Sequence, residues 1–284
     1  MHKNYRIKSA VIRIALHIIC ISVLLICVIP LYLLFLNATR KSIDIISGVS
    51  FFPGDNLVEN FKGLLEYCEN MDYDLIRSFF NSCIISILST SLCVYFSALT
   101  AYAFHAYEFK GKKILFGIVM LIIMIPGQLG MIGFYDLVVD LQIIDTFIPL
   151  TLPAIASAST VFFITQYLKA NFSKDYIEAA RVDGGNEFYI FNLITLPIVK
   201  PSLLTMGIMG IVSSWNNFMG PLLYLQSTEN YTLPLIAYQV GIATDIDYGI
   251  QYLALALTIV PLMIIYFFFS KQIINGVAAG GVKE

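Results

Sequence analysis

The chain has 284 residues, of which 58% are hydrophobic and only 13% charged, and its mean hydropathy is +0.79. A soluble domain carries about 25% charged residues, so this composition excludes an ordinary soluble protein and indicates that most of the chain lies in lipid. The net charge of −2 and the isoelectric point of about 5.9 exclude the basic surface that a nucleic-acid partner requires.

Six segments are apolar and long enough to cross a membrane as helices, which needs about 20 residues each. Apart from Arg13 and His17 in the first, these segments contain no charged or histidine side chain. The first resembles a signal peptide, but it is longer than a signal sequence and no cleavage site follows it, so we expect a retained anchor. The sequence therefore predicts an all-α polytopic membrane protein with one transmembrane domain over residues 1–284 and spans at 12–36, 78–104, 114–135, 146–168, 202–225 and 250–270.

Two details of these segments bear on the architecture. In the third, Pro126 is followed by Gly127, Gly130 and Gly133, which predicts a break in the helix. Such breaks occur where protein or a water-filled cavity surrounds the backbone. Residues 231–243 are apolar but too short to span, which is typical of a re-entrant or interfacial segment, or of a loop that reaches into an external partner.

The distribution of basic residues predicts the orientation. Thirteen of the 17 lysines and arginines fall in the N-terminus, the loops at 105–113 and 169–201, and the C-terminus. Basic residues accumulate on the cytoplasmic side. We therefore expect both termini and the 169–201 loop in the cytoplasm, and external segments at about 37–76, 136–145 and 226–249. The 37–76 segment is interpreted as a solvated loop with an amphipathic piece.

The 169–201 loop contains the polar stretch DYIEAARVDGGNEFYIFNLITLPIVKP, Asp175 to Pro201. Ser173 can cap a helix that starts near Lys174. The spacing of Lys174 to Glu178 and of Glu178 to Arg181 predicts two ion pairs on its surface. Gly184 and Gly185 are expected to end this helix, because a left-handed terminal residue is favourable for glycine.

A second short helix is predicted to follow the two glycines. Asn186 can cap it, and Phe188, Phe191 and Ile194 fall on one face over residues 187–195. Pro197 and Pro201 are expected to turn the chain back into the membrane. This helix-turn-helix suits either insertion into a partner's cleft or rest on the membrane surface. It lacks the Lys/Arg richness and large apolar face that surface binding requires.

The loop closely resembles the EAA motif of permease subunits of binding-protein-dependent ABC importers. The residues that carry this resemblance are Glu178, Ala179, Ala180, Asp183, Gly184, Ile194, Leu196 and Pro197. Other segments are similar to the carbohydrate branch, specifically the maltose-type second permease: the stretch NSCIISILSTSL from Asn81, then AYAF, GKK, MIPGQ, SWNNFMGPLLYL and the tail NGVAAGGVK. The resemblance covers about residues 10–284. It departs slightly at Gly185, where alanine is common, and we expect no consequence.

The resemblance implies a type I importer permease fold and a set of partners. Residues 173–184 would form a coupling helix that docks on a cytoplasmic ABC ATPase dimer, with Arg181 among the coupling residues. ATP and Mg would be bound by that ATPase, and this chain would hold no cofactor. A second permease would complete the pore as a heterodimer, and an external substrate-binding protein would deliver a sugar or oligosaccharide. The location implied is a bacterial cytoplasmic membrane, with lipid around the spans.

Uncharged polar and aromatic side chains inside the spans are candidates for the substrate path, because they hydrogen-bond or stack on sugars. The alternative is that they form hydrogen bonds between helices. Trp215 beside two asparagines is the strongest candidate of the set Trp215, Asn216, Asn217, Gln128, Asn81 and Gln166.

Two other function classes compete with the importer. An ion-coupled secondary transporter usually has charged groups buried in its spans, and here they are missing beyond the first. A membrane enzyme requires a nucleophile–base pair or a metal cluster, and the three histidines have no metal-ligand spacing. The chain also lacks a phosphate-binding G-x-x-x-x-G-K-[ST] loop. We therefore expect this chain alone to be non-catalytic, neither hydrolysing ATP nor transporting.

Overall fold

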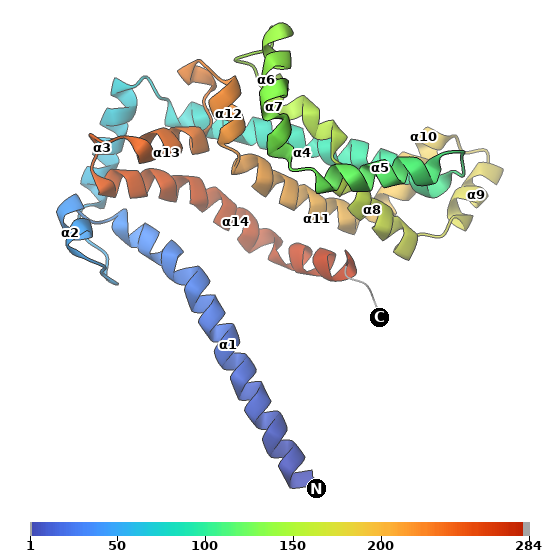
Figure 1. Ribbon diagram of the computed structural model, residues 1–284, viewed down its shortest axis with the longest axis horizontal. Helices are drawn as coiled ribbons and strands as arrows, with labels where there is room; N and C mark the ends of the chain where they lie inside the picture. The colour runs from blue at the N-terminus through green and yellow to red at the C-terminus, as the bar shows by residue number, and fades with distance from the viewer. Residues whose placement is uncertain (1, 281–284) are drawn as a thin grey trace. The chain divides into compact units, whose positions relative to one another are not determined.

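Within the described residues, five helical segments are long and apolar enough to cross a membrane, and a bent pair of shorter helices provides a sixth (Figure 1). The computed structural model describes residues 2–280, with side chains from 12 to 272. These segments lie in or end with α1 (His2–Asn37), α4 (Leu75–Ala106), α8 (Ala158–Asn171), α11 (Leu196–Trp215) and α14 (Tyr248–Gly280). The segment of α8 begins at Ile148, and that of α11 begins at Glu187. Each of the six predicted segments overlaps one of these helical spans.

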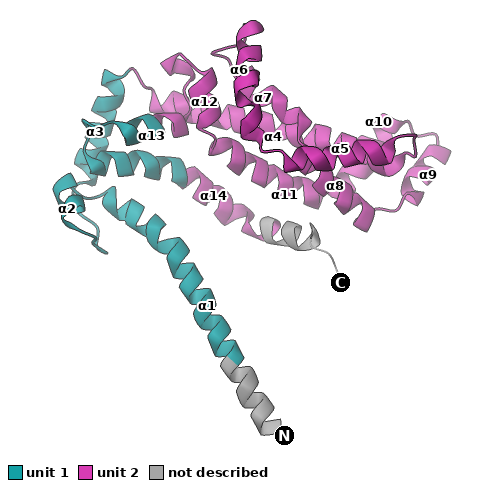
Figure 2. Cartoon of the chain, in the orientation of Figure 1, with its two compact units in different colours: residues 1–71, 237–259 teal, residues 72–236, 260–284 magenta. Residues whose placement is uncertain are grey.

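The chain divides into two compact units, shown in Figure 2. Unit 1 comprises residues 1–71 and 237–259, and unit 2 comprises residues 72–236 and 260–284. The short apolar run at 231–243 forms α13 (Leu233–Ile242), a ten-residue helix, which confirms that it is too short to span.

Unit 1 contains α1, α2 (Ser42–Ser47) and α3 (Leu57–Asn70). The turn after α1 is held by Asn60, whose Nδ2 donates hydrogen bonds to the carbonyls of Ala38 and Arg40 at 2.9 and 3.0 Å. Asn60 belongs to a buried face of α3 with Leu64 and Cys68, at a spacing of four residues. The expected amphipathic piece of the 37–76 segment is therefore α3.

Unit 2 is built around α4, which packs against α8 and α11. Serines are buried along α4, at Ser82, Ser86, Ser89 and Ser97. Small side chains of this kind let helix backbones approach closely within a membrane. The close approach is also visible at Gly210 of α11, where an added Cβ would lie 3.0 Å from Thr90 Cγ2 on α4.

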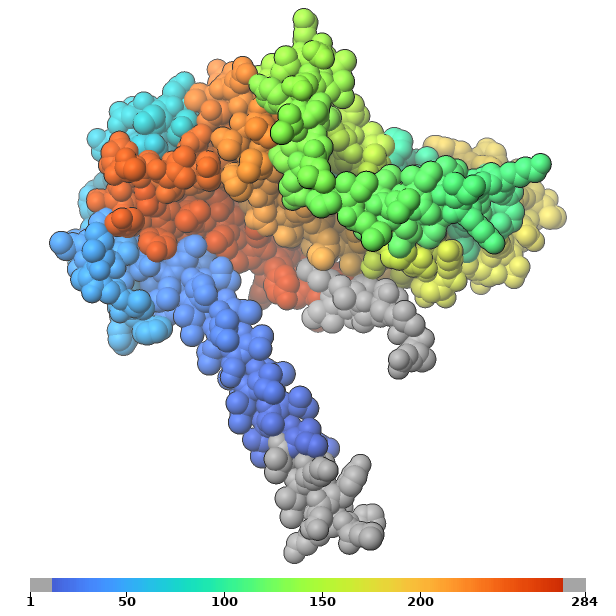
Figure 3. All heavy atoms as spheres, in the orientation of Figure 1, coloured from blue at the N-terminus to red at the C-terminus, as the bar shows by residue number. Residues whose placement is uncertain are grey.

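The third predicted span is broken, as the sequence indicated. It consists of α5 (Lys112–Met124), a 3₁₀ turn η1 (Gly127–Gly130) and α6 (Met131–Asp140), and the two α-helices differ in direction by 91°. Pro126 lies at the bend, where its missing N–H interrupts the helical hydrogen bonds. Figure 3 shows α6, in green, standing out from the rest of unit 2.

The fourth span is also interrupted. α7 (Ile148–Thr151) and the 3₁₀ turn η2 (Leu152–Ala156) precede α8, and the Ser157 hydroxyl accepts a hydrogen bond from the Thr160 N–H at the start of α8. A serine at this position satisfies one of the unpaired donors of the first turn.

The predicted fifth span, 202–225, had the wrong boundaries. The helical segment begins at Glu187, runs through α10 (Glu187–Tyr189), a π-helical stretch η3 (Ile190–Thr195) and α11, and ends at Trp215. Pro197 lies in the first turn of α11 and Pro201 lies inside it, so neither proline turns the chain as expected. Pro197 directly follows the π-helical stretch Ile190–Thr195, where the regular α-helical hydrogen-bond pattern is already interrupted. After Trp215 the chain breaks before α12 (Met219–Tyr224).

Candidate functional site

The motif loop forms helix α9 (Asp175–Val182), one residue later than expected. Ser173 contributes at its start, since its hydroxyl accepts a hydrogen bond from the Asp175 N–H at 3.3 Å. Ile177 is fully buried and joins Phe172, Ile190 and other apolar side chains of α4, α8 and α11 in one core cluster. This anchor fixes which side of α9 faces outward.

The turn after α9 follows the sequence prediction. Gly184 has φ +84°, the left-handed conformation that glycine adopts without strain. Asn186 Oδ1 accepts a hydrogen bond from the Tyr189 N–H at 2.8 Å and so caps α10. We expected no consequence of having glycine in place of alanine at position 185, but the structure shows one. An added Cβ would lie 2.8 Å from the Ala180 carbonyl oxygen, so alanine there requires a shift of the turn.

The two ion pairs expected along α9 are replaced by pairs with other elements. Lys174 Nζ lies 2.6 Å from Glu108 Oε1, in the segment after α4. Arg181 Nε lies 2.7 Å from Glu187 Oε1, across the glycine turn. Glu187 Oε2 also accepts a hydrogen bond from the Tyr102 hydroxyl of α4 at 2.6 Å. Helical spacing predicts only partners within one helix. The sequence therefore did not indicate that Arg181 would pair with Glu187 across the turn, or that Tyr102 would bind the same carboxylate.

The outward face of α9 carries small, acidic and apolar residues together. Glu178, Ala179 and Asp183 are exposed, and Val182 is 87% exposed. Phe188, expected on the packed face of the second helix, is instead 73% exposed, in the short helix α10 that follows the glycine turn. We call the set Glu178, Ala179, Val182, Asp183 and Phe188 the α9 surface. An exposed patch that mixes large apolar side chains with charge is typical of a protein interface.

The remaining coupling candidates face the core or lie beside it. Ala180 and Leu196 are half-buried against the core cluster, and Pro197 is exposed in the first turn of α11. Ala180 and Leu196 therefore support the position of α9 and α11, while Glu178, Ala179, Asp183 and Gly184 form the accessible part of the motif.

A second feature of unit 2 is a cavity of about 430 Å³ among α4, α8 and α11. It is within the size range of small-ligand sites. Its lining carries hydroxyl and amide groups and no charged side chain: Ser89, Thr90, Ser157, Ser159, Thr160, Ser213, Ser214 and Asn217, with Cys93, Leu150, Ala154, Met206, Met209 and Gly210. We call it the hydroxyl cavity. Serine and threonine are enriched at contacts between transmembrane helices, so their presence in a span does not by itself predict a cavity.

The six sequence-predicted path residues have different positions. Asn217 lines the hydroxyl cavity, and it shares a neighbouring cavity of about 640 Å³ with Gln128. Trp215 is buried and its ring packs edge-on against Phe79, with ring centroids 5.7 Å apart. Asn216 is exposed at the end of α11, and Gln166 is half-buried on α8; neither is among the residues lining these two cavities.

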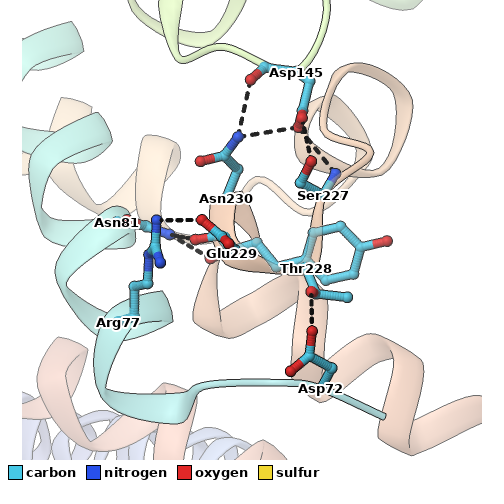
Figure 4. A network of polar contacts seen from close by, with 9 residues as sticks. Asp72, Arg77, Asn81, Asp145, Ser227, Thr228, Glu229 and Asn230 are labelled. Carbon is cyan, nitrogen blue, oxygen red and sulfur yellow. Dashed lines mark hydrogen bonds and ion pairs between the residues drawn. The ribbon is translucent and has the colours of Figure 1, made fainter.

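Asn81 takes the alternative role of joining structural elements. Its Nδ2 donates hydrogen bonds to the Glu229 and Tyr231 carbonyls at 2.9 and 3.0 Å, far from it in sequence. It belongs to a polar network at one end of unit 2, drawn in Figure 4, in which Arg77 NH2 also lies 2.8 Å from Glu229 Oε2.

Asp145 is the centre of the other half of that network (Figure 4). Its Oδ1 accepts hydrogen bonds from the Gln226 and Ser227 N–H groups and from Asn230 Nδ2, at 2.9, 3.0 and 3.1 Å. Partial burial raises the pKa of this carboxyl, but the hydrogen bonds from Ser227, Gln226 and Asn230 outweigh it and lower the pKa to about 2. Asp145 thereby fixes the segment 226–230, which includes the turn η4 (Thr228–Asn230), to the chain before α7.

Comparisons with known proteins agree with this architecture. The family model described as "Binding-protein-dependent transport system inner membrane component" matches residues 94–278. The arabinooligosaccharides transport system permease protein AraQ of Halalkalibacterium halodurans is 36% identical over 267 residues, covering 91% of this chain and 92% of AraQ. AraQ of Bacillus subtilis is 34% identical over 281 residues, covering 97% and 98%.

The fold is similar to a solved structure as well. A chain from the crystal structure of a bacterial ABC transporter involved in the import of the acidic polysaccharide alginate superposes with a TM-score of 0.78 at 19% identity, covering 92% of this chain and 96% of that one.

Proposed function

Because this chain belongs to the family of binding-protein-dependent transport system inner membrane components, we propose that it forms part of the pore through which an ATP-driven importer carries a sugar or oligosaccharide across the cell membrane. The subunit itself is a non-catalytic transport component. The observation that carries the sugar assignment is the hydroxyl cavity, whose lining has neutral hydrogen-bonding groups and no charge.

The chemistry of that cavity favours a neutral, hydroxylated substrate. Serine and threonine hydroxyls both donate and accept, as sugar hydroxyls do. A phosphorylated substrate would require a cation, and neither lysine nor arginine lines the cavity. The AraQ relatives make arabinose-containing oligosaccharides the first sugars to test.

The α9 surface is the proposed contact with the ATPase dimer, which would bind ATP and Mg. Its small residue Ala179 allows close approach, while Val182 and Phe188 provide apolar area that is exposed in the single chain. Movement of α9 would reach α4 through the bonds of Glu187 to Arg181 and Tyr102.

A second permease is the proposed partner of α6. This helix stands out from its own unit (Figure 3), and three of its apolar side chains are exposed, Ile132 at 80%, Leu137 at 48% and Val139 at 46%. A heterodimer would cover this helix and complete the path beside the cavity that Gln128 and Asn217 line.

The proposed orientation places both termini and α9 in the cytoplasm, following the positive-inside distribution. The network of Asp145 and Asn81 would then lie outside, where it fixes the 226–230 segment before α13. This side would meet the substrate-binding protein.

Affinity purification of the tagged chain from its native membrane, with mass spectrometry of the partners, tests the assembly. Recovery of a second permease, an ATPase and a binding protein is expected, and the binding protein can then be titrated with a panel of neutral oligosaccharides. Recovery of the chain alone, or as a homodimer without an ATPase, would overturn the proposal and favour a secondary transporter.

A further inference from the structure

A cavity of about 670 Å³ opens at the α9 end of unit 2, beside the lysine-bearing turn between α4 and α5. Its walls come from the end of α4, the start of α5 and the end of α8, helices that lie side by side in Figure 1. Since these are ends of apolar spans, the cavity lies at the level of the membrane–water boundary. It is separate from the hydroxyl cavity and shares no lining residue with it.

One wall of this cavity is aromatic. Phe104 packs against both Phe109 and Phe116, with ring centroids 6.3 and 5.5 Å apart. We call these three residues the phenylalanine wall. Ile114, 70% exposed, continues the apolar surface. A surface of this kind, open at the depth of the acyl chains, matches a hydrocarbon tail rather than a soluble ligand.

The cavity also has a cationic lining. Lys112, Lys113 and Lys169 line the cavity with a single acidic residue, Glu108. Glu108 is already bound by two lysines, since its Oε1 lies 2.9 Å from Lys112 Nζ and 2.6 Å from Lys174 Nζ. These hydrogen bonds from Lys174 and Lys112 lower the pKa of the Glu108 carboxyl to about 2, so it stays ionised and engaged.

Two of the three lining lysines are available to bind an anionic ligand. Within the described part of the chain, Lys113 and Lys169 have no carboxylate within salt-bridge distance. Lys169 is held over the phenylalanine wall, with Nζ 4.8 Å from the centroid of the Phe116 ring. Its charge therefore lies where the apolar and cationic walls meet.

We propose that this cavity binds an anionic phospholipid, with its phosphate between Lys113 and Lys169 and an acyl chain along the phenylalanine wall. Basic pockets between transmembrane helices at the membrane surface recognise lipid headgroups in this way. The site adjoins Lys174, which Glu108 links to the start of α9, so a bound lipid would stabilise the region that positions the α9 surface.

Native mass spectrometry of the purified whole transporter, with added phosphatidylglycerol or phosphatidylcholine, tests the proposal. The unaltered protein should retain more phosphatidylglycerol than phosphatidylcholine. Each lysine near a membrane surface attracts anionic lipid by an amount equivalent to about fivefold in affinity, so Lys113→Gln with Lys169→Gln should weaken phosphatidylglycerol retention by at least tenfold. The matched control, Lys200→Gln with Lys271→Gln, removes two exposed lysines that do not line the cavity and should change retention by less than twofold.

A second variant tests the apolar wall separately. Ile114→Trp keeps every lysine and fills part of the cavity at an exposed position, so it should lower retention of both lipids. An excess of inorganic phosphate should leave bound phosphatidylglycerol in place. The proposal is overturned by absence of a phosphatidylglycerol preference in the unaltered protein, by equal losses in the double variant and its control, by unchanged retention in Ile114→Trp, or by displacement with phosphate.

Discussion

Arg181 and Glu187 face each other across the Gly184–Gly185 turn, with Arg181 Nε 2.7 Å from Glu187 Oε1. The second oxygen of the same carboxylate accepts the hydroxyl hydrogen of Tyr102 at 2.6 Å. One side chain at the start of α10 therefore joins α9 to α4. Both members of the ion pair are about a third or more exposed, so the pair contributes at most about 1 kcal/mol to stability. Its importance lies in connecting the two helices.

Removing the hydroxyl of Tyr102 should weaken this connection without unfolding the protein. Tyr102→Phe loses one hydrogen bond to a charged group, about 1.5–3 kcal/mol, while the ring keeps its packing against Phe191. We expect the assembled transporter to keep its ATPase activity but to transport several times less substrate per ATP. Uptake and ATP hydrolysis measured together in proteoliposomes give this ratio. Tyr248→Phe, an exposed tyrosine in unit 1, is the control, and an unchanged ratio in Tyr102→Phe would show that α4 receives no signal through Glu187.

Substitutions at Gly184 separate backbone strain from docking. With φ +84° and no atom within 4 Å of an added Cβ, Gly184→Ala should cost about 1 kcal/mol and leave transport largely intact. Gly184→Asp adds a charge to the same position, as Ala179→Glu does on α9. Both should insert in the membrane but lose the ATPase on co-purification and abolish transport. Full transport by these charged variants would argue against the α9 surface as the ATPase contact.

The Asp145 network predicts a pH dependence at the 226–230 segment. The folded pKa of Asp145, about 2, is below its ordinary value of 3.8, so its stabilising effect is present above about pH 4 and is lost as the pH falls from 4 toward 2. Hydrogen exchange of the Gln226–Asn230 amides should be constant from pH 7 to 5, after correction for intrinsic rates. It should rise only below pH 4.

Asp145→Asn tests the same network at neutral pH. Asparagine tolerates the left-handed backbone that Asp145 adopts, at φ +59°, so the substitution removes the charge and keeps the turn. Exchange at Gln226–Asn230 should become faster at pH 7. The exposed Asp140→Asn is the control, and equal exchange in both variants would mean that the charge of Asp145 does not hold the segment.

Narrowing the hydroxyl cavity should impair transport at a site far from α9. Ser213 lines this cavity on α11, and Ser213→Leu replaces a hydroxyl with a larger apolar side chain. We expect normal insertion and ATPase binding but at least a tenfold lower rate of sugar uptake. Ser91→Leu on α4, an exposed position outside the cavity lining, provides the matched control. Equal uptake by the two variants would exclude the cavity from the substrate path.

The features that depend on local chemistry could be predicted from the sequence. The break at Pro126, the left-handed Gly184 and the capping of α10 by Asn186 each follow from the conformational preference of one residue type. The apolar length of the spans follows in the same way from the thickness of the membrane.

The features that depend on tertiary partners could not be predicted from the sequence. Lys174 and Arg181 each had an acceptable partner at helical spacing, Glu178, but bind Glu108 and Glu187 instead, because packing of Ile177 into the core fixes which way α9 faces. The role of Asn81 depended on carbonyls 148 and 150 residues away. The boundary at Glu187 was missed because Pro197 and Pro201 were interpreted as a break. The helical segment instead continues through both prolines, after the π-helical stretch Ile190–Thr195.

In the proposed importer, the helical segment from Glu187 to Trp215 would act as a lever arm between the ATPase contact and the hydroxyl cavity. Its 29 residues form a rod roughly 44 Å long at 1.5 Å per residue. One end carries Phe188 of the α9 surface, and the other carries Ser213 and Ser214 of the hydroxyl cavity. With a fulcrum at the π-helical stretch Ile190–Thr195, the arm from Thr195 to Ser213 is about 27 Å long, and a tilt of about 10° would displace its far end by about 5 Å. In the importer proposed above, a small movement of the α9 surface would therefore become a larger movement of the hydroxyl cavity wall, because the π-helical stretch lies close to the α9 end of the segment.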